Sequence, residues 1–229
     1  MLRELGQELW AAEESRRVLG VELGMRMSVA RLRSGGLFLH APLAPSEPLR
    51  AALGALGEVR CVVAPNLDHD GQLGAWHDAF PGARLFGPPG MGSCGASVAA
   101  LGDVAEPEWE GDFEQVIFAG APRLSEVVFY HRPSRSLLLA DLAWHLAARG
   151  GLLGRAALGL SMRLRRFGPP KQVRWLFSDR AAAQRSLKRV LAWDFDRVIV
   201  CHGAVLETGG KQALARAYDW LSAPELWWQ

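Results

Sequence analysis

Hydrophobic and polar positions alternate along several stretches of this chain with the two-residue period of a β-strand. Residues 25–33 alternate strictly, meet Ser34-Gly35-Gly36 and continue into the apolar stretch 37–40, which predicts a β-hairpin. The apolar run 59–64 is short and rich in β-branched residues, as expected for a buried strand. Comparable patterns predict strands at about 83–87, 115–119, 126–131, 136–140 and 197–201.

Other stretches place apolar residues at the spacing of an amphipathic helix. This spacing predicts an N-terminal helix within residues 1–20, over 3–19, ending near Gly20. Residues 142–166 are helical in pattern too, but Gly150-Gly151 and Gly154 favour a bent or two-piece helix. Shorter helices are expected at about 47–56 and 73–80, after a cap at Ser178 or Asp179, and at 211–221.

The order of these elements indicates one domain spanning residues 1–229. Strands and helices follow each other without a long Ser- or Pro-rich linker, and no internal repeat interrupts them. Hydrophobic residues make up 49% of the chain, which is enough to bury a core and excludes a disordered or collagen-like protein.

Charge, cysteine content and hydropathy exclude several functional classes. The net charge of +2 and the lack of a basic run with interleaved aromatics argue against a nucleic-acid partner. Cys61, Cys94 and Cys201 form no C-x-x-C pair, which favours a reducing compartment. The N-terminus has no apolar signal-peptide core, and no apolar stretch approaches the roughly 18–20 residues of a membrane span. We therefore expect a cytoplasmic protein without stable membrane insertion.

Acidic and imidazole side chains follow three of the predicted strands. Asp68-His69 comes after 59–64, Asp141 after 136–140, and His202 after 197–201. Strand ends are where α/β sheets gather ligands, and two imidazoles with two carboxylates would suit zinc, iron or manganese. In the alternative interpretation the two aspartates cap the helices that follow them, and the histidines simply pack at strand ends.

Five segments of the chain, in order, resemble the metallo-β-lactamase superfamily. Val62-Val63-Ala64-Pro65-Asn66-Leu67-Asp68-His69 resembles the loop T-H-x-H-x-D-H, with its final D-H pair retained. The remaining four are Leu37 to Pro42, which resembles the segment ending in Asp-x-Gly; Phe118 to Pro122 with the strand from Glu126, which resembles H-T-P-G; Leu139-Ala140-Asp141; and Val198 to Gly203. The degenerate motif is similar to that of a bacterial branch of the superfamily.

The resemblance implies an αββα sandwich of two mixed β-sheets with helices on the outer faces. It also implies that one of the superfamily's two metal sites has been lost, because its histidine positions are Ala64, Asn66 and Gly120 here. At the second metal site, all four ligand positions carry residues that can bind a metal: Asp68, His69, Asp141 and His202. One divalent metal ion is therefore expected, zinc in preference to iron or manganese.

The implied activity is metal-dependent hydrolysis of an ester, thioester, amide or phosphodiester. Asn66 would donate a hydrogen bond to the substrate oxygen, and Asp70 would accept a proton. His145, four residues after Asp141, could face the same pocket. Two alternatives stay open: a non-catalytic metal-binding or interaction module on the same fold, and an iron-dependent redox protein.

The segment 142–177, interpreted as a basic helical insertion, carries no acidic residue. Its basic residues are Arg149, Arg155, Arg163, Arg165, Arg166, Lys171 and Arg174. Such asymmetry indicates an anionic small-molecule substrate, an acidic partner or transient contact with a membrane surface. In the alternative interpretation the segment is a solvated helix face whose arginines pair with acidic residues of the rest of the chain. The sequence leaves homo-oligomer formation open.

Overall fold

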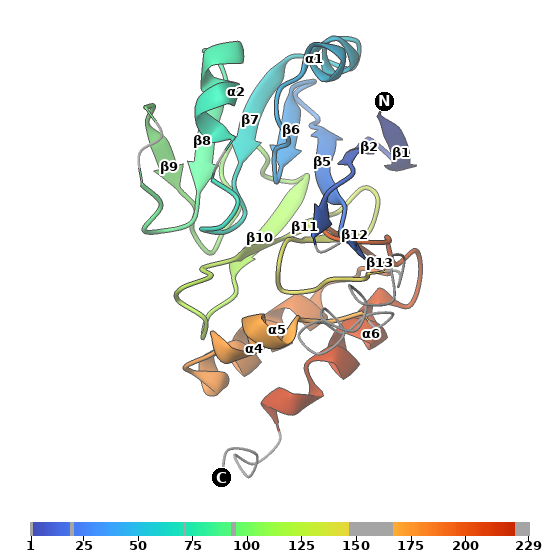
Figure 1. The fold of residues 1–229 in the computed structure, drawn as a ribbon, viewed down its shortest axis with the longest axis vertical. Helices are drawn as coiled ribbons and strands as arrows, with labels where there is room; N and C mark the ends of the chain where they lie inside the picture. Colours follow the sequence, from blue (N-terminus) through green and yellow to red (C-terminus); the bar gives the residue numbers. More distant parts are fainter. Residues whose placement is uncertain (1, 19–20, 71, 93–94, 147–166, 223–229) are drawn as a thin grey trace.

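The computed structural model describes residues 2–18, 21–70, 72–92, 95–146 and 167–222. They form two mixed sheets packed face to face with helices outside, so the expected αββα sandwich is confirmed (Figure 1). Helices α1 (Glu47–Gly54) and α2 (Leu73–Ala79) cover the outer face of the first sheet. Helices α4 (Lys171–Trp175), α5 (Arg180–Ala192) and α6 (Gly210–Ala217) cover that of the second.

The first sheet has seven strands. In spatial order they are β1 (Arg3–Gly6), β2 (Leu9–Glu14), β5 (Met25–Arg31), β6 (Leu37–His40), β7 (Val59–Val63), β8 (Arg84–Gly87) and β9 (Val98–Ala100). The pairs from β1 to β6 are antiparallel, which confirms the predicted hairpin of β5 and β6, and the pairs from β6 to β9 are parallel. Strands β6 and β7 therefore end at the same edge of the sheet.

The second sheet has four strands. They are β10 (Phe113–Ile117), β11 (Val127–His131), β12 (Ser136–Leu139) and β13 (Arg197–Val200), in that spatial order. β12 and β13 are parallel, so the loops after both strands also leave at one edge. A two-stranded ribbon, β3 (Arg17–Val18) with β4 (Val21–Glu22), and a 3-10 turn at Asp219–Leu221 complete the described elements.

Aromatic side chains from both sheets fill the space between them. Phe38 on β6 lies 4.5 Å from Phe113 and 5.5 Å from Phe129, measured between ring centroids, and 5.0 Å from Trp109. All four side chains are buried. Such rings bury large apolar areas, which gives the strand ends a rigid support.

The helix predicted for residues 3–19 is wrong, because this segment forms β1 and β2. β2 pairs with β5 from Leu9 opposite Ala30 to Glu14 opposite Met25. Leu9 and Ala11 point into the core between the sheets. The turn before β2 places Glu8 at a φ of +55°. The segment forms strands because β5 has a free edge. Pairing with that edge gives the backbone N–H and C=O groups of β2 hydrogen-bond partners and buries its apolar side chains at the same time.

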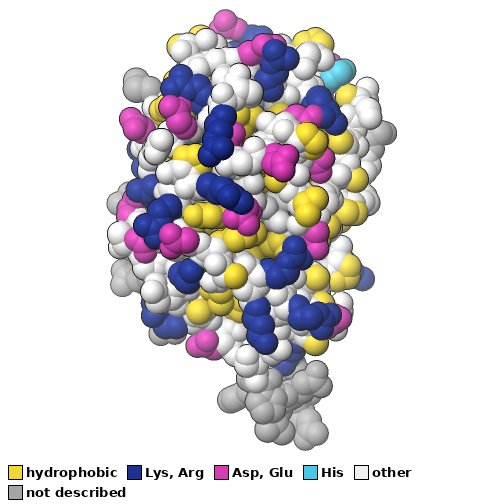
Figure 2. Space-filling view, turned by 180° about the vertical axis from the view of Figure 1, so that it is seen from behind, with side chains coloured by type: hydrophobic (Ala, Val, Ile, Leu, Met, Phe, Trp, Pro, Cys, Tyr) yellow, Lys and Arg dark blue, Asp and Glu magenta, His cyan; other side chains and the backbone are white. Residues whose placement is uncertain are grey.

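The prediction of a basic helical insertion falls mostly outside the described residues. Arg149, Arg155, Arg163, Arg165 and Arg166 all lie in 147–166, beyond the described ranges, whereas Lys171 and Arg174 belong to α4. Figure 2 shows Lys and Arg side chains interspersed with Asp and Glu over much of one face, so that face carries no large field of one sign. Among the described residues, no helix is long and apolar enough to cross a membrane.

Candidate metal centre

Loops that follow β7, β12 and β13 meet at one edge of the sandwich. They carry Asp68 and His69, Asp141, and His202, and all four residues line one cavity of about 310 Å³. The rest of the lining is Arg16, Leu23, Met25, Trp144 and Val173. The structure thus brings together the four residues that the sequence singled out as ligands, although their binding of a metal stays a prediction.

Asn66 lies fully buried at this edge, and its neighbours fix the orientation of its amide. The Nδ2 atom is 3.0 Å from Oε2 of Glu126 and 2.9 Å from Oδ2 of Asp141. Because both are carboxylate oxygens, the atom facing them is the donor nitrogen. The amide oxygen then accepts from the backbone N–H of Asp68 (3.0 Å) and from Nδ1 of His69 (2.8 Å). Both amide hydrogens are used, so none remains for a substrate oxygen.

The same contacts determine where the two imidazoles carry their protons. Nδ1 of His69 faces an amide oxygen, and Nδ1 of His202 lies 2.9 Å from the carbonyl oxygen of Gly24. Carbonyl oxygens only accept, so each Nδ1 carries a hydrogen, and in a neutral ring of His202 the lone pair then lies on Nε2. Burial lowers the pKa of His202, which keeps its ring neutral near pH 7.

Asp141 lies between the two imidazoles. Its Oδ2 atom is 3.4 Å from Nδ1 of His69, and its Oδ1 atom is 3.6 Å from Nε2 of His202. Trp144 donates its indole N–H to the same Oδ1 at 2.9 Å. The distance between Oδ1 and the His202 nitrogen exceeds that of a hydrogen bond. Oδ1 of Asp141 and Nε2 of the neutral His202 ring are both hydrogen-bond acceptors, and a cation bound between them would stabilise this arrangement.

Glu126 organises this edge from behind, although the sequence pattern indicated only the start of a strand there. One oxygen accepts from the backbone N–H of Ala140 (2.8 Å), and the other from those of Asp141 (2.7 Å) and Leu142 (3.1 Å). Burial and the nearby Asp141 carboxylate raise the pKa of Glu126 to about 8, while these N–H donors act against that rise. In the sequence, the one feature that could have pointed to this role of Glu126 is a single acidic residue directly before an apolar run.

The remaining candidate residues differ in their access to the cavity. Asp68 is exposed at its rim, and partial desolvation together with Asp141 raises the pKa of its carboxyl group. Asp70 is exposed and does not line the cavity. His145 also lies outside the lining, with its Nδ1 atom 3.1 Å from the carbonyl oxygen of Ala204.

The backbone explains why residue 120 offers no ligand. Gly120 has a φ of +93°, and a Cβ atom there would lie 2.3 Å from the carbonyl oxygen of Asp179. Its own carbonyl oxygen accepts from the N–H groups of Ser178 (2.8 Å) and Asp179 (3.2 Å), just before α5. Any side chain at position 120 would push this helix start away. Residue 120 therefore serves the close packing of this loop against the start of α5.

The four candidate ligands fit a divalent ion in chemistry, and two of them also fit in placement. Imidazole nitrogen and carboxylate oxygen suit zinc, and Asp141 with His202 presents one acceptor of each kind. Within the described ranges, however, no three His, Cys, Asp or Glu side chains converge into a ready metal site. For a complete metal coordination shell, the side chain of His69 or Asp68 would need to turn toward Asp141 and His202.

Sequence comparison places most of the site within a family. A family model described as "Domain of unknown function (DUF4336)" matches residues 6–150, which contain Asp68, His69 and Asp141 but not His202. No curated protein matches the sequence significantly.

Solved structures with a similar fold include a metallo-beta-lactamase from Pontibacter korlensis, with a TM-score of 0.63, 14% identity, and coverage of 98% of this chain and 99% of that one. A metallo beta lactamase from Erythrobacter litoralis has a TM-score of 0.64 at 15% identity, over 96% and 91% of the chains. The flavodiiron core of Flv1 from Synechocystis sp. PCC6803 has a TM-score of 0.66 at 11% identity; 97% of this chain spans 60% of that one. At these identities the likeness concerns the fold, which is that of the metallo-β-lactamases.

Proposed function

Given that the chain belongs to the DUF4336 family, whose description names no function, we propose that it is a metal-dependent hydrolase with one divalent ion, zinc by preference. Asp68, His69, Asp141 and His202 would hold the ion. The observation that carries the proposal is the 3.6 Å approach of two acceptors, Oδ1 of Asp141 and Nε2 of His202, inside a cavity. The likeness in fold to metallo-β-lactamases supports it.

In this proposal the two sides of the cavity have separate tasks. When bound, the ion would lower the pKa of a water molecule and polarise a carbonyl or phosphoryl oxygen. Asn66 and Glu126 hold Asp141 from behind, so in this proposal they position a ligand and do not touch substrate. Trp144 donates its indole N–H to Asp141, and its ring lies 4.6 Å from that of His202 between centroids, tilted by 50°.

The substrate we propose is a small anionic molecule. Arg16 is the cation in the described lining of the cavity, and no acidic side chain among the described residues forms an ion pair with its guanidinium. Its Nη1 atom donates to the sulfur of Met25 at 3.2 Å, a weak acceptor. A carboxylate or phosphate of the substrate would be a much stronger partner for it. The cavity volume is at the lower end of the range for ligand pockets.

Metal content and turnover together test the proposal. Protein purified without chelator should contain about one zinc ion per chain and hydrolyse members of a panel of anionic esters, thioesters, amides and phosphodiesters. Removing the ion with a chelator should abolish turnover, and added zinc should restore it. Turnover that survives complete removal of metal would refute the assignment.

The second candidate is a binding module without turnover, and one observation favours it. Both oxygens of Asp141 already accept hydrogen bonds, from Asn66 and from Trp144. Because the carboxylate of Asp141 has these hydrogen-bond partners, the site can keep its structure without a bound ion. Protein that contains no metal and binds an anion without hydrolysing it would identify this case, and iron in the same elemental analysis would favour the redox alternative.

A further inference from the structure

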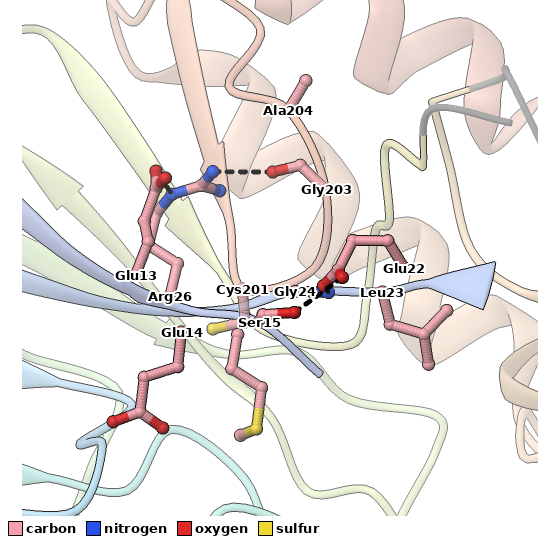
Figure 3. Close-up of a pocket in the computed structure, with 11 residues that line it drawn as sticks. Glu13, Glu14, Ser15, Glu22, Leu23, Gly24, Arg26, Cys201, Gly203 and Ala204 are labelled. Carbon is pink, nitrogen blue, oxygen red and sulfur yellow. Dashed lines mark hydrogen bonds and ion pairs between the residues drawn. The ribbon is translucent and has the colours of Figure 1, made fainter. Parts of the chain in front are cut away.

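A buried arginine connects the N-terminal part of the chain to the loop that carries His202. Arg26 on β5 is 7% exposed. Its Nη2 atom donates to the carbonyl oxygen of Gly203 at 2.6 Å, and its Nη1 atom donates to that of Val200. Its Nε atom donates to Glu13 at 2.9 Å (Figure 3). The planar guanidinium thus reaches two backbone carbonyls and a carboxylate at once.

The two carbonyls belong to the residues on either side of the pair Cys201-His202. The opposite side of this segment is held as well, because Nδ1 of His202 donates to the carbonyl oxygen of Gly24, two residues before Arg26. Residues 24–26 therefore fix the backbone around His202 at two points and its ring at a third. These contacts act on the atoms that decide where Nε2 points.

An arginine is well suited to this task, and lysine is not. The five N–H groups of a guanidinium lie in one plane with fixed spacing, so donation to two carbonyls also fixes their separation. A lysine ammonium could keep the ion pair with Glu13 but would not reproduce this two-pronged contact. A charge buried to this degree is costly unless it is fully paired, and Arg26 is paired at every edge described above.

We propose that Arg26 is a positioning residue that sets the orientation of the His202 imidazole. The inference rests on the proposed function only for the consequence that His202 binds an ion. The orientation itself is a property of the metal-free protein. The family match ends at residue 150, so through Arg26 the matched segment would position a residue in the loop after the last strand, β13.

The test compares Arg26→Lys with Arg31→Lys. Arg31 lies on the same strand and pairs with Glu8 at 2.6 Å, so its variant changes the same residue type away from His202. In metal-free protein labelled with 15N-histidine, NMR should show His202 of the wild type and of Arg31→Lys as the tautomer protonated at Nδ1. Arg26→Lys should show mixed tautomers. In zinc titrations, Arg26→Lys should bind about 10- to 100-fold more weakly.

Unchanged tautomer and unchanged zinc affinity in a folded Arg26→Lys protein would overturn the proposal. If that variant does not fold, Glu13→Gln replaces it, since this change removes the charge partner that helps to hold the guanidinium of Arg26 against the two carbonyls. A partial shift of the His202 tautomer is then expected, and no shift would count against the proposal. Should the wild type bind no zinc, the proposed function fails, while the NMR comparison still decides the role of Arg26.

Discussion

His202 and Gly24 are joined by a 2.9 Å hydrogen bond between Nδ1 and a carbonyl oxygen, although 178 positions separate them in the chain. This bond fixes the proton on Nδ1 and leaves the Nε2 lone pair facing Asp141. A backbone carbonyl that orients a histidine in this way is a frequent feature around metal-binding imidazoles. The contact also shows that the site depends on both ends of the chain.

Removing either member of the acceptor pair should remove most of the bound metal. Asp141→Ala and His202→Ala each delete one donor from a shell of at most four. The wild type is expected to hold about one zinc ion per chain, measured by elemental analysis after dialysis, and to show no appreciable β-lactamase activity. His77→Ala, on α2 outside the cavity lining, serves as the control and should retain the ion. Two ions per chain in the wild type would contradict the assignment.

Replacing Asn66 should damage stability and metal binding together. Asn66→Ala removes a donor from Glu126 and from Asp141 and leaves both carboxylates less satisfied in a buried position. We expect a loss of about 2–4 kcal/mol in the free energy of unfolding, measured with urea, and weaker zinc binding. Asp70→Ala, in the same loop but exposed, should change stability by less than about 0.5 kcal/mol. Wild-type stability of Asn66→Ala would show that the amide network is dispensable.

Arg16 should determine affinity for anions at the cavity. In protein stripped of metal, Arg16→Gln is expected to raise the dissociation constant of inorganic phosphate about three- to tenfold, followed by NMR or calorimetry, and to reduce its salt dependence. Arg17→Gln is the matched control, since Arg17 pairs with Glu22 at 3.3 Å and does not line the cavity. Equal affinities for the two variants would rule out Arg16 as the anion-binding residue.

Acid should destabilise the protein partly through His131. This side chain is buried, its Nδ1 atom lies 2.7 Å from the hydroxyl of Ser134, and its Nε2 atom has no hydrogen-bond partner among the described residues. Burial lowers the pKa of His131 from 6.5 to about 4 in the folded state. Between these two values the unfolded chain takes up the proton first, so stability is full above about pH 6.5 and falls as the pH drops toward 4.

The contribution of His131 can be isolated by substitution. His131→Gln should reduce the loss of unfolding free energy between pH 7 and pH 5 by about 2 kcal/mol, measured by urea unfolding at both values. His77→Gln, on a helix at the surface, is expected to leave the difference unchanged. If the His131 variant shows the full wild-type loss, the proton uptake occurs elsewhere.

The sequence by itself determined the strands that carry the site. The runs 59–64, 136–140 and 197–201 are apolar enough to be identified as buried strands from their residues alone. The polar residues that follow these runs, and that line the cavity, stand out for the same reason; they are Asp68, His69, Asp141 and His202. Periodicity is reliable there because a strand buried on both faces tolerates few polar side chains.

Only the tertiary structure decided the first two strands and the support of the site. Residues 3–19 fit a helical spacing, but the open edge of β5 offered a partner that no local pattern records. The roles of Asn66, Glu126 and Arg26 were equally hidden, since each depends on contacts with atoms at least 14 positions away in sequence. Buried polar groups must be satisfied wherever the fold supplies partners, and that requirement is met in space, independently of order along the chain.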